Sequence, residues 1–279
     1  GAPVPPHVLK RMKAAIHPAG DVHTPYGATE ALPVASISAT EVLAETAAKS
    51  AVGAGTCVGR HFPGIEWKVI RITDEPIAII ADAEELSPGE IGELIVRGSV
   101  VTTEYVTRID CNPLHKIRDG DTFWHRMGDV GYLEVVGTLR VPSLDHGTRS
   151  VPTTETRFWF CGRKSHRVIT ARGTLFTIPC EAIFNQHPWI YRSALVGVGP
   201  RAQKRPVVFV EPWPEHRLKT HKLWTELTAE LRQLALQHSH TAEIQDFLLL
   251  DALPVDIRHN AKIFREKLVV LAEKRLRTP

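Results

Sequence analysis

The chain has 279 residues, of which 43% are hydrophobic and 23% charged, so it can bury a core as one large or two ordinary domains. This balance excludes a disordered chain. The net charge is +3, and the basic residues do not cluster except in the last predicted helix, which argues against a nucleic-acid binder. We therefore expect a globular protein that binds no nucleic acid.

Membrane insertion and disulfide bonding are not expected either. No apolar run approaches the roughly 18 residues that span a bilayer, and the first residues do not resemble a signal peptide. The cysteines are widely scattered, without a CxxC pair or metal-ligand spacing: Cys57, Cys111, Cys161 and Cys180. We expect reduced thiols in a cytoplasmic protein.

The first part of the chain is rich in strand patterns. Residues 7–16 predict a helix, because apolar residues from Val8 to Ile16 recur at helical spacing. Strands are then predicted at 67–72, 77–81 and 93–97, with turn residues such as Ser-Pro-Gly at 87–89 between them. The middle of the chain should therefore be a β-rich region.

Strands and helices alternate after Arg163. The predicted strands are 167–170, 175–177, 193–198 and 206–210. The predicted helices are 180–186, one with Leu223, Leu227, Leu231 and Leu234 on a single face, and a last one from residue 261. This alternation indicates a small α/β or α+β domain, so we assign residues 1–162 and 163–279 to two domains.

Residues 140–157 (RVPSLDHGTRSVPTTETR) fit neither domain. They are rich in Pro, Ser and Thr and show no periodicity. This composition predicts a mobile surface loop, inserted near the end of the first domain.

Four short strings are candidates for a functional site, and each also has an ordinary explanation. Residues 26–30 (YGATE) combine a ring that could stack on a base, a hydroxyl that could bind phosphate and a carboxylate that could bind Mg²⁺. The ordinary explanation is that they form a simple turn. Asp129 lies between two glycines and could cap its own backbone or accept hydrogen bonds from ribose hydroxyls.

The other two strings are basic. Arg163 lies in the segment CGRKSHRVI, at the point where the composition of the chain changes. This segment is either a solvated hinge, or a hinge that brings the Arg163 guanidinium to a phosphate or ribose in an interdomain cleft. Lys262 lies in NAKIFR at the start of the last predicted helix, and is either a surface lysine or a group that neutralises charge on a carboxylate–phosphate transition state.

Three other patterns do not support a site. The glycines of residues 53–59 (GAGTCVG) misplace the third glycine of a dinucleotide loop. His238 and His240 show neither HExxH spacing nor nearby cysteines, so no metal centre is expected there. There is also no GxSxG elbow.

Taken together and in this order, the four strings resemble the late motifs of the adenylate-forming superfamily, which includes acyl-CoA synthetases, luciferases and peptide-synthetase adenylation domains. The opening Gly1-Ala2-Pro3 resembles the adenine-pocket loop of that family, and residues 92–98 (GELIVRG) resemble another of its motifs. Within this superfamily, the sequence most resembles the β-lactone synthetases of bacterial olefin biosynthesis. Four segments carry this resemblance: YGATEALPVASI, HRMGDVGY, FCGRKSHRVI and PVDIRHNAKIFREKL.

The resemblance implies a role for each matching residue. Tyr26 would stack on adenine, with Gly1, Ala2 and Pro3 lining that pocket, and Gly27 would belong to the same nucleotide-binding site. Thr29 would bind the α-phosphate and Glu30 the Mg²⁺. Asp129 and Arg163 would bind ribose, Lys164 would be the hinge, and Lys262 would be the adenylation lysine.

The resemblance also implies a fold and a reaction. The expected fold is α/β (α+β): the remainder of a large AMP-binding domain ending in a small distorted β-barrel, followed by a compact lid domain. With ATP and Mg²⁺, the enzyme would adenylate a long-chain β-hydroxy fatty acid and close it to a β-lactone, together with other enzymes of olefin biosynthesis. The alternatives are a fatty acyl-CoA synthetase and a non-catalytic module. Since the Ser/Thr/Gly-rich phosphate loop of the superfamily does not occur in these 279 residues, we expect this chain alone to be inactive.

Overall fold

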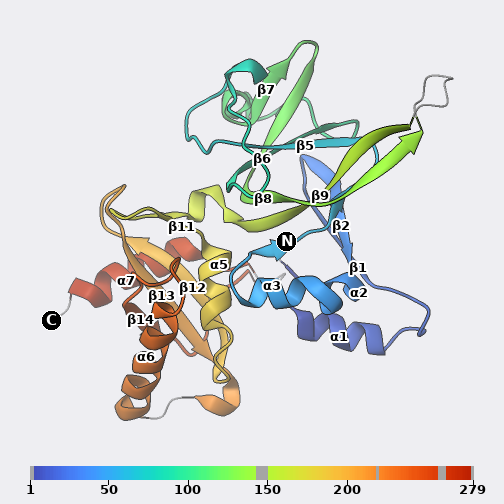
Figure 1. Ribbon diagram of the computed structural model, residues 1–279. Helices are drawn as coiled ribbons and strands as arrows, with labels where there is room; N and C mark the ends of the chain where they lie inside the picture. The colour runs from blue at the N-terminus through green and yellow to red at the C-terminus, as the bar shows by residue number, and fades with distance from the viewer. Residues whose placement is uncertain (1–2, 143–149, 218–219, 257–261, 278–279) are drawn as a thin grey trace. The chain divides into compact units, whose positions relative to one another are not determined.

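The computed structural model describes residues 3–142, 150–217, 220–256 and 262–277, and confirms the predicted mixed α/β class (Figure 1). Two compact units are distinguished by their internal contacts. The strand-rich unit consists of Val4–Ala47 and Thr56–Phe160, and the α/β unit of Gly1–Pro3, Ala48–Gly55 and Cys161–Pro279. The division after Phe160 falls two residues before the predicted boundary.

The strand-rich unit contains most of the strands, and its helices are short. In chain order its elements are α1 (Pro6–Ala14), β1 (His23–Ala28), β2 (Ala31–Ser38), α2 (Ala39–Glu41), a π-helical turn (Val42–Thr46), β3 (Thr56–Cys57), β4 (Arg60–His61), β5 (Ile65–Ile70), a 3-10 turn (Ile80–Asp82), β6 (Gly92–Gly98), a 3-10 turn (Ile109–Cys111), α4 (Asn112–His115), β7 (Lys116–Asp119), β8 (Thr122–Pro142) and β9 (Ser150–Arg163), whose last three residues belong to the other unit.

Two sheets form this unit. The smaller sheet has the order β1-β2-β4, and the larger has the order β3-β9-β8-β6-β5 with β7 paired to β8. Side chains alternate between the faces of β6: Leu94 and Val96 pack in one apolar cluster, and Ile95 packs in another. Within the described residues β3 and β5 form the edges of an open sheet, so the sheet does not close into the expected small distorted β-barrel.

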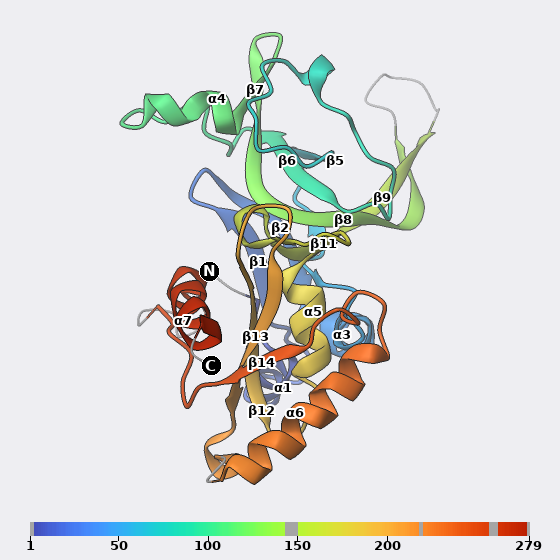
Figure 2. The same cartoon turned by 90° about the vertical axis from the view of Figure 1, so that its left-hand side faces the viewer.

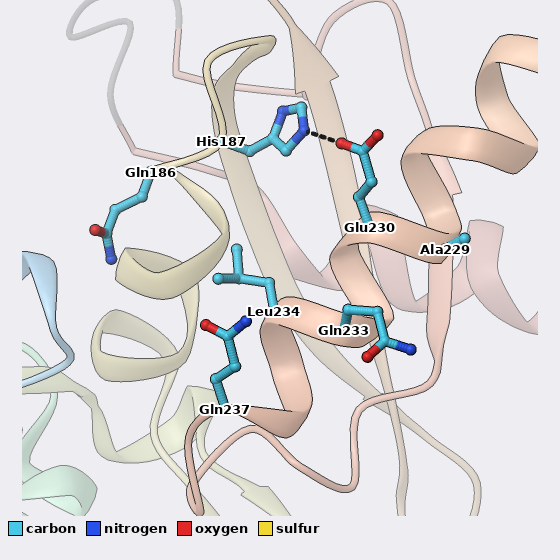
Figure 3. Close-up of a pocket in the computed structure, with 7 residues that line it drawn as sticks. All are labelled: Gln186, His187, Ala229, Glu230, Gln233, Leu234 and Gln237. Atoms are coloured by element: carbon cyan, nitrogen blue, oxygen red, sulfur yellow. Dashed lines mark hydrogen bonds and ion pairs between the residues drawn. The ribbon is translucent and has the colours of Figure 1, made fainter.

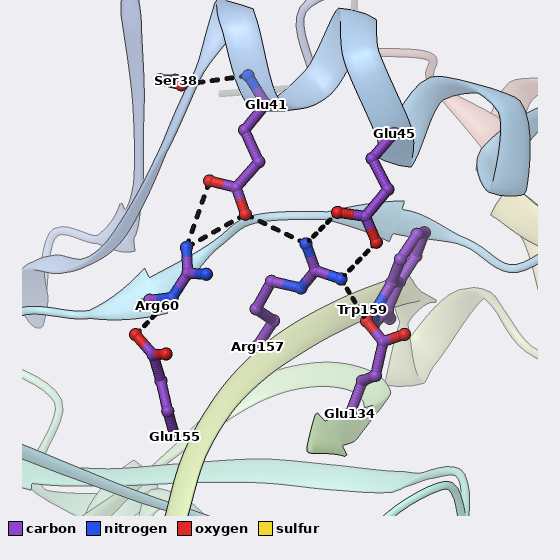
Figure 4. A network of polar contacts seen from close by, with 8 residues as sticks. All are labelled: Ser38, Glu41, Glu45, Arg60, Glu134, Glu155, Arg157 and Trp159. Atoms are coloured by element: carbon purple, nitrogen blue, oxygen red, sulfur yellow. Dashed lines mark hydrogen bonds and ion pairs between the residues drawn. The ribbon is translucent and has the colours of Figure 1, made fainter. Parts of the chain in front are cut away.

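The expected loop at 140–157 is wrong for the part that the structure describes. Residues 140–142 end β8 and residues 150–157 begin β9, while 143–149 lie outside the described residues. Arg157 is buried, with 3% of its surface exposed. Its guanidinium donates to Glu45 at 2.7 and 2.9 Å, to Glu41 at 3.0 Å and to Glu134 at 2.9 Å (Figure 4). This Arg157 cluster attaches α2 and the π-helical turn to β8 and β9.

A second expectation, the strand at 77–81, is also wrong. Only Ile79 forms an isolated bridge there, to Arg118 of β7, and a 3-10 turn follows at Ile80–Asp82. The apolar residues that suggested a strand instead cover the sheet, because Ile77 and Ile80 pack against Ile95 and Trp124.

The α/β unit contains a three-stranded sheet covered by helices. Its elements are α3 (Ala47–Ala51), whose first residue belongs to the other unit, a 3-10 turn (Lys164–His166), β10 (Val168–Ile169), β11 (Thr174–Leu175), α5 (Thr177–Phe184), β12 (Ile190–Val198), β13 (Arg205–Pro212), a 3-10 turn (Pro214–His216), α6 (His221–Leu236), β14 (Asp246–Leu249) and α7 (Arg265–Arg277).

The period-two pattern of β12 and β13 explains how both faces of this sheet are covered. Strand β13 is antiparallel to β12 and parallel to β14. Leu195 and Val208 pack with residues of α5 and α6, whereas Val196 and Phe209 pack with residues of α7. Figure 2 shows α7 on one side of the strands and α5 and α6 on the other.

The predicted apolar face of α6 is confirmed at its centre. Leu227 and Leu231 are buried, and Leu234 packs beside them. The helix begins where the hydroxyl of Thr220 accepts a hydrogen bond from the backbone N–H of Leu223 at 3.3 Å.

Candidate functional site

Tyr26 and Gly27 lie on β1, where this strand meets β2. The pairing register shifts between Tyr26 and Ala28. A Cβ atom on Gly27 would lie 2.5 Å from the carbonyl oxygen of Ala31 and 2.8 Å from Cδ1 of Leu32. The glycine is therefore needed because two backbones approach closely, and not only to make the segment flexible.

A hydrogen bond joins Tyr26 to Asp129, although 103 residues separate them in the sequence. The Tyr26 hydroxyl donates to Oδ2 of Asp129 at 2.5 Å. Asp129 lies on β8 with 3% of its surface exposed, directly after Gly128, whose φ of 66° favours glycine. The Tyr26 ring is half-buried and lies 6.0 Å from the Phe158 ring. The strand-rich unit thus brings together an aromatic ring and a carboxylate that were predicted separately.

Thr29 and Glu30 form the turn that connects β1 to β2. Thr29 is exposed and Glu30 is half-buried. The Glu30 carboxylate accepts a hydrogen bond from the Tyr105 hydroxyl at 2.8 Å. Partial burial alone would raise the pKa of Glu30, but this bond and the nearby His125 and Lys116 together hold the pKa below its ordinary value. The carboxylate is therefore ionised at neutral pH.

The polar groups around Glu30 were missed by the sequence analysis. Lys116 is 7% exposed, and its ammonium donates to the carbonyl oxygen and, at 3.1 Å, to the hydroxyl of Thr102. Burial lowers the pKa of Lys116 to about 8. His125 is 2% exposed, and burial together with the Lys116 charge lowers its pKa to about 4, so its ring is neutral at pH 7. The Tyr105 ring lies 6.4 Å from the His125 ring.

The remaining predicted site residues belong to the α/β unit. Pro3 is exposed, and Gly1 and Ala2 lie outside the described residues. Arg163 is the exposed last residue of β9, and Lys164 begins the 3-10 turn that follows it. Lys262 is exposed and precedes α7, which begins at Arg265, so the expectation that Lys262 opens the last helix is wrong.

Arg163 and Lys262 both act on one imidazole, that of His166. Burial, followed by the positive charges of Arg265, Arg163 and Lys262, lowers the pKa of His166 to about 4. The start of α7 is fixed close by, because Arg265 donates to Glu181 at 2.5 Å and to the carbonyl oxygen of Leu195 at 2.9 Å. Two of the predicted cations, Arg163 and Lys262, therefore influence the titration of His166 in the α/β unit.

The donor set at Glu30 fits a magnesium ion that binds together with a nucleotide. Within the described ranges, no group of three or more His, Cys, Asp or Glu side chains could hold a metal by itself. Mg²⁺ commonly takes one or two carboxylates and completes its octahedron with substrate phosphates and water. The ionised, half-buried carboxylate of Glu30 matches that pattern.

The buried thiols are unsuited to nucleophilic chemistry. All four cysteines are free, and three of them are buried. Burial raises the pKa of Cys57 to about 11 and that of Cys161 to about 12, so neither is a thiolate at neutral pH. Nucleophilic attack by a buried cysteine is therefore not part of the site.

An open hollow of 510 Å³ on the α/β unit contains none of the predicted site residues (Figure 3). It is lined by Gln186, His187, Ala229, Glu230, Gln233, Leu234 and Gln237. Its one pair of titratable groups, His187 and Glu230, lies 2.9 Å apart, and Glu230 is 66% exposed. This chemistry does not resemble a nucleotide site.

Comparisons with known proteins agree with the geometry of the strand-rich unit. The family described as "AMP-binding enzyme" matches residues 1–106. Over these residues the chain is similar to AMP-binding enzymes. It is 42% identical over 277 residues to an olefin beta-lactone synthetase of Xanthomonas campestris pv. campestris, covering 98% of this chain and 46% of that protein. The chain therefore spans about half the length of the curated relatives it matches.

Two solved structures share the fold. The amide bond synthetase McbA from Marinactinospora thermotolerans has a TM-score of 0.68 at 19% identity, over 98% of this chain and 45% of that one. The O-succinylbenzoate coenzyme A synthetase from Bacillus subtilis, solved with ATP and magnesium ion, has a TM-score of 0.63 at 20% identity, over 96% of this chain and 45% of that one. Across the part of the chain that the structure describes, no helix has the length and apolar character that a membrane crossing requires.

Proposed function

We propose that this chain provides the adenylate- and metal-binding residues of an ATP-dependent, AMP-forming ligase. The enzyme would activate a long-chain β-hydroxy fatty acid as its acyl-AMP and close it to a β-lactone. The observation that supports this reaction most directly is the 42% identity, along 98% of the chain, to an olefin beta-lactone synthetase.

Nucleotide binding would begin at Tyr26 and Asp129. A tyrosine ring can stack on adenine, and a fixed carboxylate can accept hydrogen bonds from both ribose hydroxyls. The hydrogen bond at 2.5 Å from the Tyr26 hydroxyl holds Oδ2 of Asp129 in place. An ionised carboxylate has about four acceptor positions, so it can accept from more than one hydroxyl.

The turn between β1 and β2 would bind the phosphates. The exposed hydroxyl of Thr29 would donate to the α-phosphate, and Gly27 allows β1 and β2 to approach closely just before this turn. Glu30 would hold Mg²⁺, which neutralises charge on the triphosphate when it is bound.

The α/β unit would contribute the remaining cations. Arg163 would support the ribose, and Lys262 would neutralise charge that develops between the carboxylate and the α-phosphate. Lys164, directly after β9, would act as the hinge. Pro3, with Gly1 and Ala2, would line the adenine pocket.

The proposed reaction has two displacements. An oxygen of the substrate carboxylate attacks the α-phosphorus, and pyrophosphate leaves. The substrate's own β-hydroxyl oxygen then attacks the acyl carbon, loses its proton, and expels AMP as the four-membered ring closes. Because the nucleophile is part of the substrate, proximity replaces a second substrate, although ring strain offsets part of the gain.

The test uses the protein as its gene encodes it, incubated with ATP, Mg²⁺ and a long-chain β-hydroxy acid, with and without coenzyme A. We expect mass spectrometry to find a product one water lighter than the acid, formed without coenzyme A. A thioester that forms only when coenzyme A is added would make the protein a fatty acyl-CoA synthetase. The absence of pyrophosphate release would make it a non-catalytic module.

A further inference from the structure

The turn that carries Glu30 is attached to a segment about 70 residues further along the chain. Ala31 forms a bridge with Val101, and the backbone N–H of Thr102 donates to the carbonyl oxygen of Glu30 at 2.8 Å. The Tyr105 hydroxyl then donates to Oε1 of Glu30 at 2.8 Å. Residues 101–105 therefore hold the Glu30 turn by both its backbone and its side chain.

Residues 101–105 are themselves fixed from α4 and β7. The Asn112 side chain accepts from the Tyr105 backbone N–H at 2.7 Å and donates to the Tyr105 carbonyl oxygen at 3.3 Å. The buried Lys116 ammonium donates to Thr102 through its carbonyl and hydroxyl oxygens. Asn112 of α4 and Lys116 of β7 thus hold the segment at Tyr105 and at Thr102. The Tyr105 hydroxyl therefore has a defined position.

We propose that Tyr105 is a positioning residue for Glu30, which directs one carboxylate oxygen toward the Mg²⁺ that accompanies ATP. This inference rests on the proposed role of Glu30. The hydrogen bond to Oε1 fixes the rotation of the carboxylate, and thereby fixes the direction of Oε2. Partners that orient a metal-binding carboxylate commonly change metal affinity by about 10- to 100-fold when they are removed.

The experiment measures metal binding directly. Mn²⁺ replaces Mg²⁺, ATP is present, and the concentration of free Mn²⁺ is followed by electron paramagnetic resonance. Tyr105→Phe removes the hydroxyl and keeps the ring, so we expect Mn²⁺ to bind about tenfold more weakly, at the lower end of the range for such partners. The affinity for ATP without metal and the thermal unfolding temperature should not change.

Two further variants make the outcome decisive. Tyr191→Phe, at a partly exposed tyrosine of the α/β unit, is the matched control and should bind Mn²⁺ like the unmodified protein. If Glu30→Gln weakens Mn²⁺ binding but Tyr105→Phe does not, the positioning role is wrong and the role of Glu30 stands. If Glu30→Gln binds Mn²⁺ normally, the metal role of Glu30 in the proposed function is wrong, and the inference about Tyr105 fails with it.

Discussion

The two units balance positive charge in opposite ways. In the strand-rich unit, the guanidinium of Arg157 is surrounded by carboxylates, and the hydrogen bonds that it donates to Glu45 are the largest of several effects that raise its pKa. In the α/β unit, the largest effect on His166 is burial, followed by three positive charges, so its pKa falls. The carboxylates around Arg157 keep its guanidinium charged, and the resulting ion pairs join α2 and the π-helical turn to β8 and β9. The surroundings of His166 keep its imidazole neutral near cations.

The largest expected effect is on stability, and comes from removing the Arg157 guanidinium from its carboxylate partners. Arg157→Met leaves three carboxylates without their shared partner, and we expect a loss of about 3 kcal/mol in the free energy of unfolding, because breaking a buried pair is costly. We place the loss at the low end of the range because the carboxylate side chains are between 23% and 46% exposed. Urea unfolding followed by circular dichroism measures it.

The control for this variant is Arg71→Met, which breaks an ion pair with Glu84 in which both side chains are more than half exposed. It should leave the free energy of unfolding almost unchanged, because an ion pair between exposed side chains contributes little. Equal losses from the two variants would show that the Arg157 cluster adds nothing beyond a surface pair.

The next effect concerns the cations near His166. In the protein as its gene encodes it, Lys262→Ala should slow ATP–pyrophosphate exchange by about 10²-fold, the scale of losing one preorganised charge contact. Lys267→Ala, at an exposed lysine in α7, should leave the rate unchanged. AMP binding should change little in Lys262→Ala, since Tyr26 and Asp129 would carry it. A normal rate of exchange would remove Lys262 from the mechanism.

The smallest effect is a dependence of stability on pH. The pKa of His166 is about 4 in the folded protein, against 6.5 for an ordinary histidine, so the unfolded chain binds the proton first as the pH falls. The contribution of neutral His166 is therefore complete above pH 6.5 and is lost between pH 6.5 and 4. Because the ring is partly exposed, we expect a loss of about 1 kcal/mol after allowing for solvent screening.

His166→Gln should remove this part of the pH dependence, which chemical unfolding at a series of pH values can measure. His221→Gln, at an exposed histidine at the start of α6, should retain it. The same loss of stability on acidification in His166→Gln would mean that another group is responsible.

The fold was predictable where the pattern was local. The period-two strands of residues 193–198 and 206–210 correspond to β12 and β13, because alternate apolar side chains cover two faces. Residues 150–157 were missed because Pro, Thr and Ser are typical of loops, and because Arg157 is buried only through carboxylates that are distant in the sequence.

The candidate site was predictable as separate residues and not as contacts. Tyr26, Glu30 and Asp129 were chosen by chemical type and resemblance, but the Tyr26–Asp129 bond depends on how β1 and β8 come together. Tyr105 and Lys116 carry no distinctive spacing in the sequence. Their relation to Glu30 arises only when residues 101–105 fold onto the β1–β2 turn.

The distribution of the cysteines provides an intrinsic labelling site. Cys57, Cys161 and Cys180 are buried, whereas Cys111 is partly exposed. Cys111 directly precedes Asn112, whose side chain holds Tyr105 through two hydrogen bonds. A thiol-reactive fluorophore added to the folded protein should therefore attach at Cys111 without any engineered cysteine, and its emission should report how the Glu30 turn responds when a nucleotide is added.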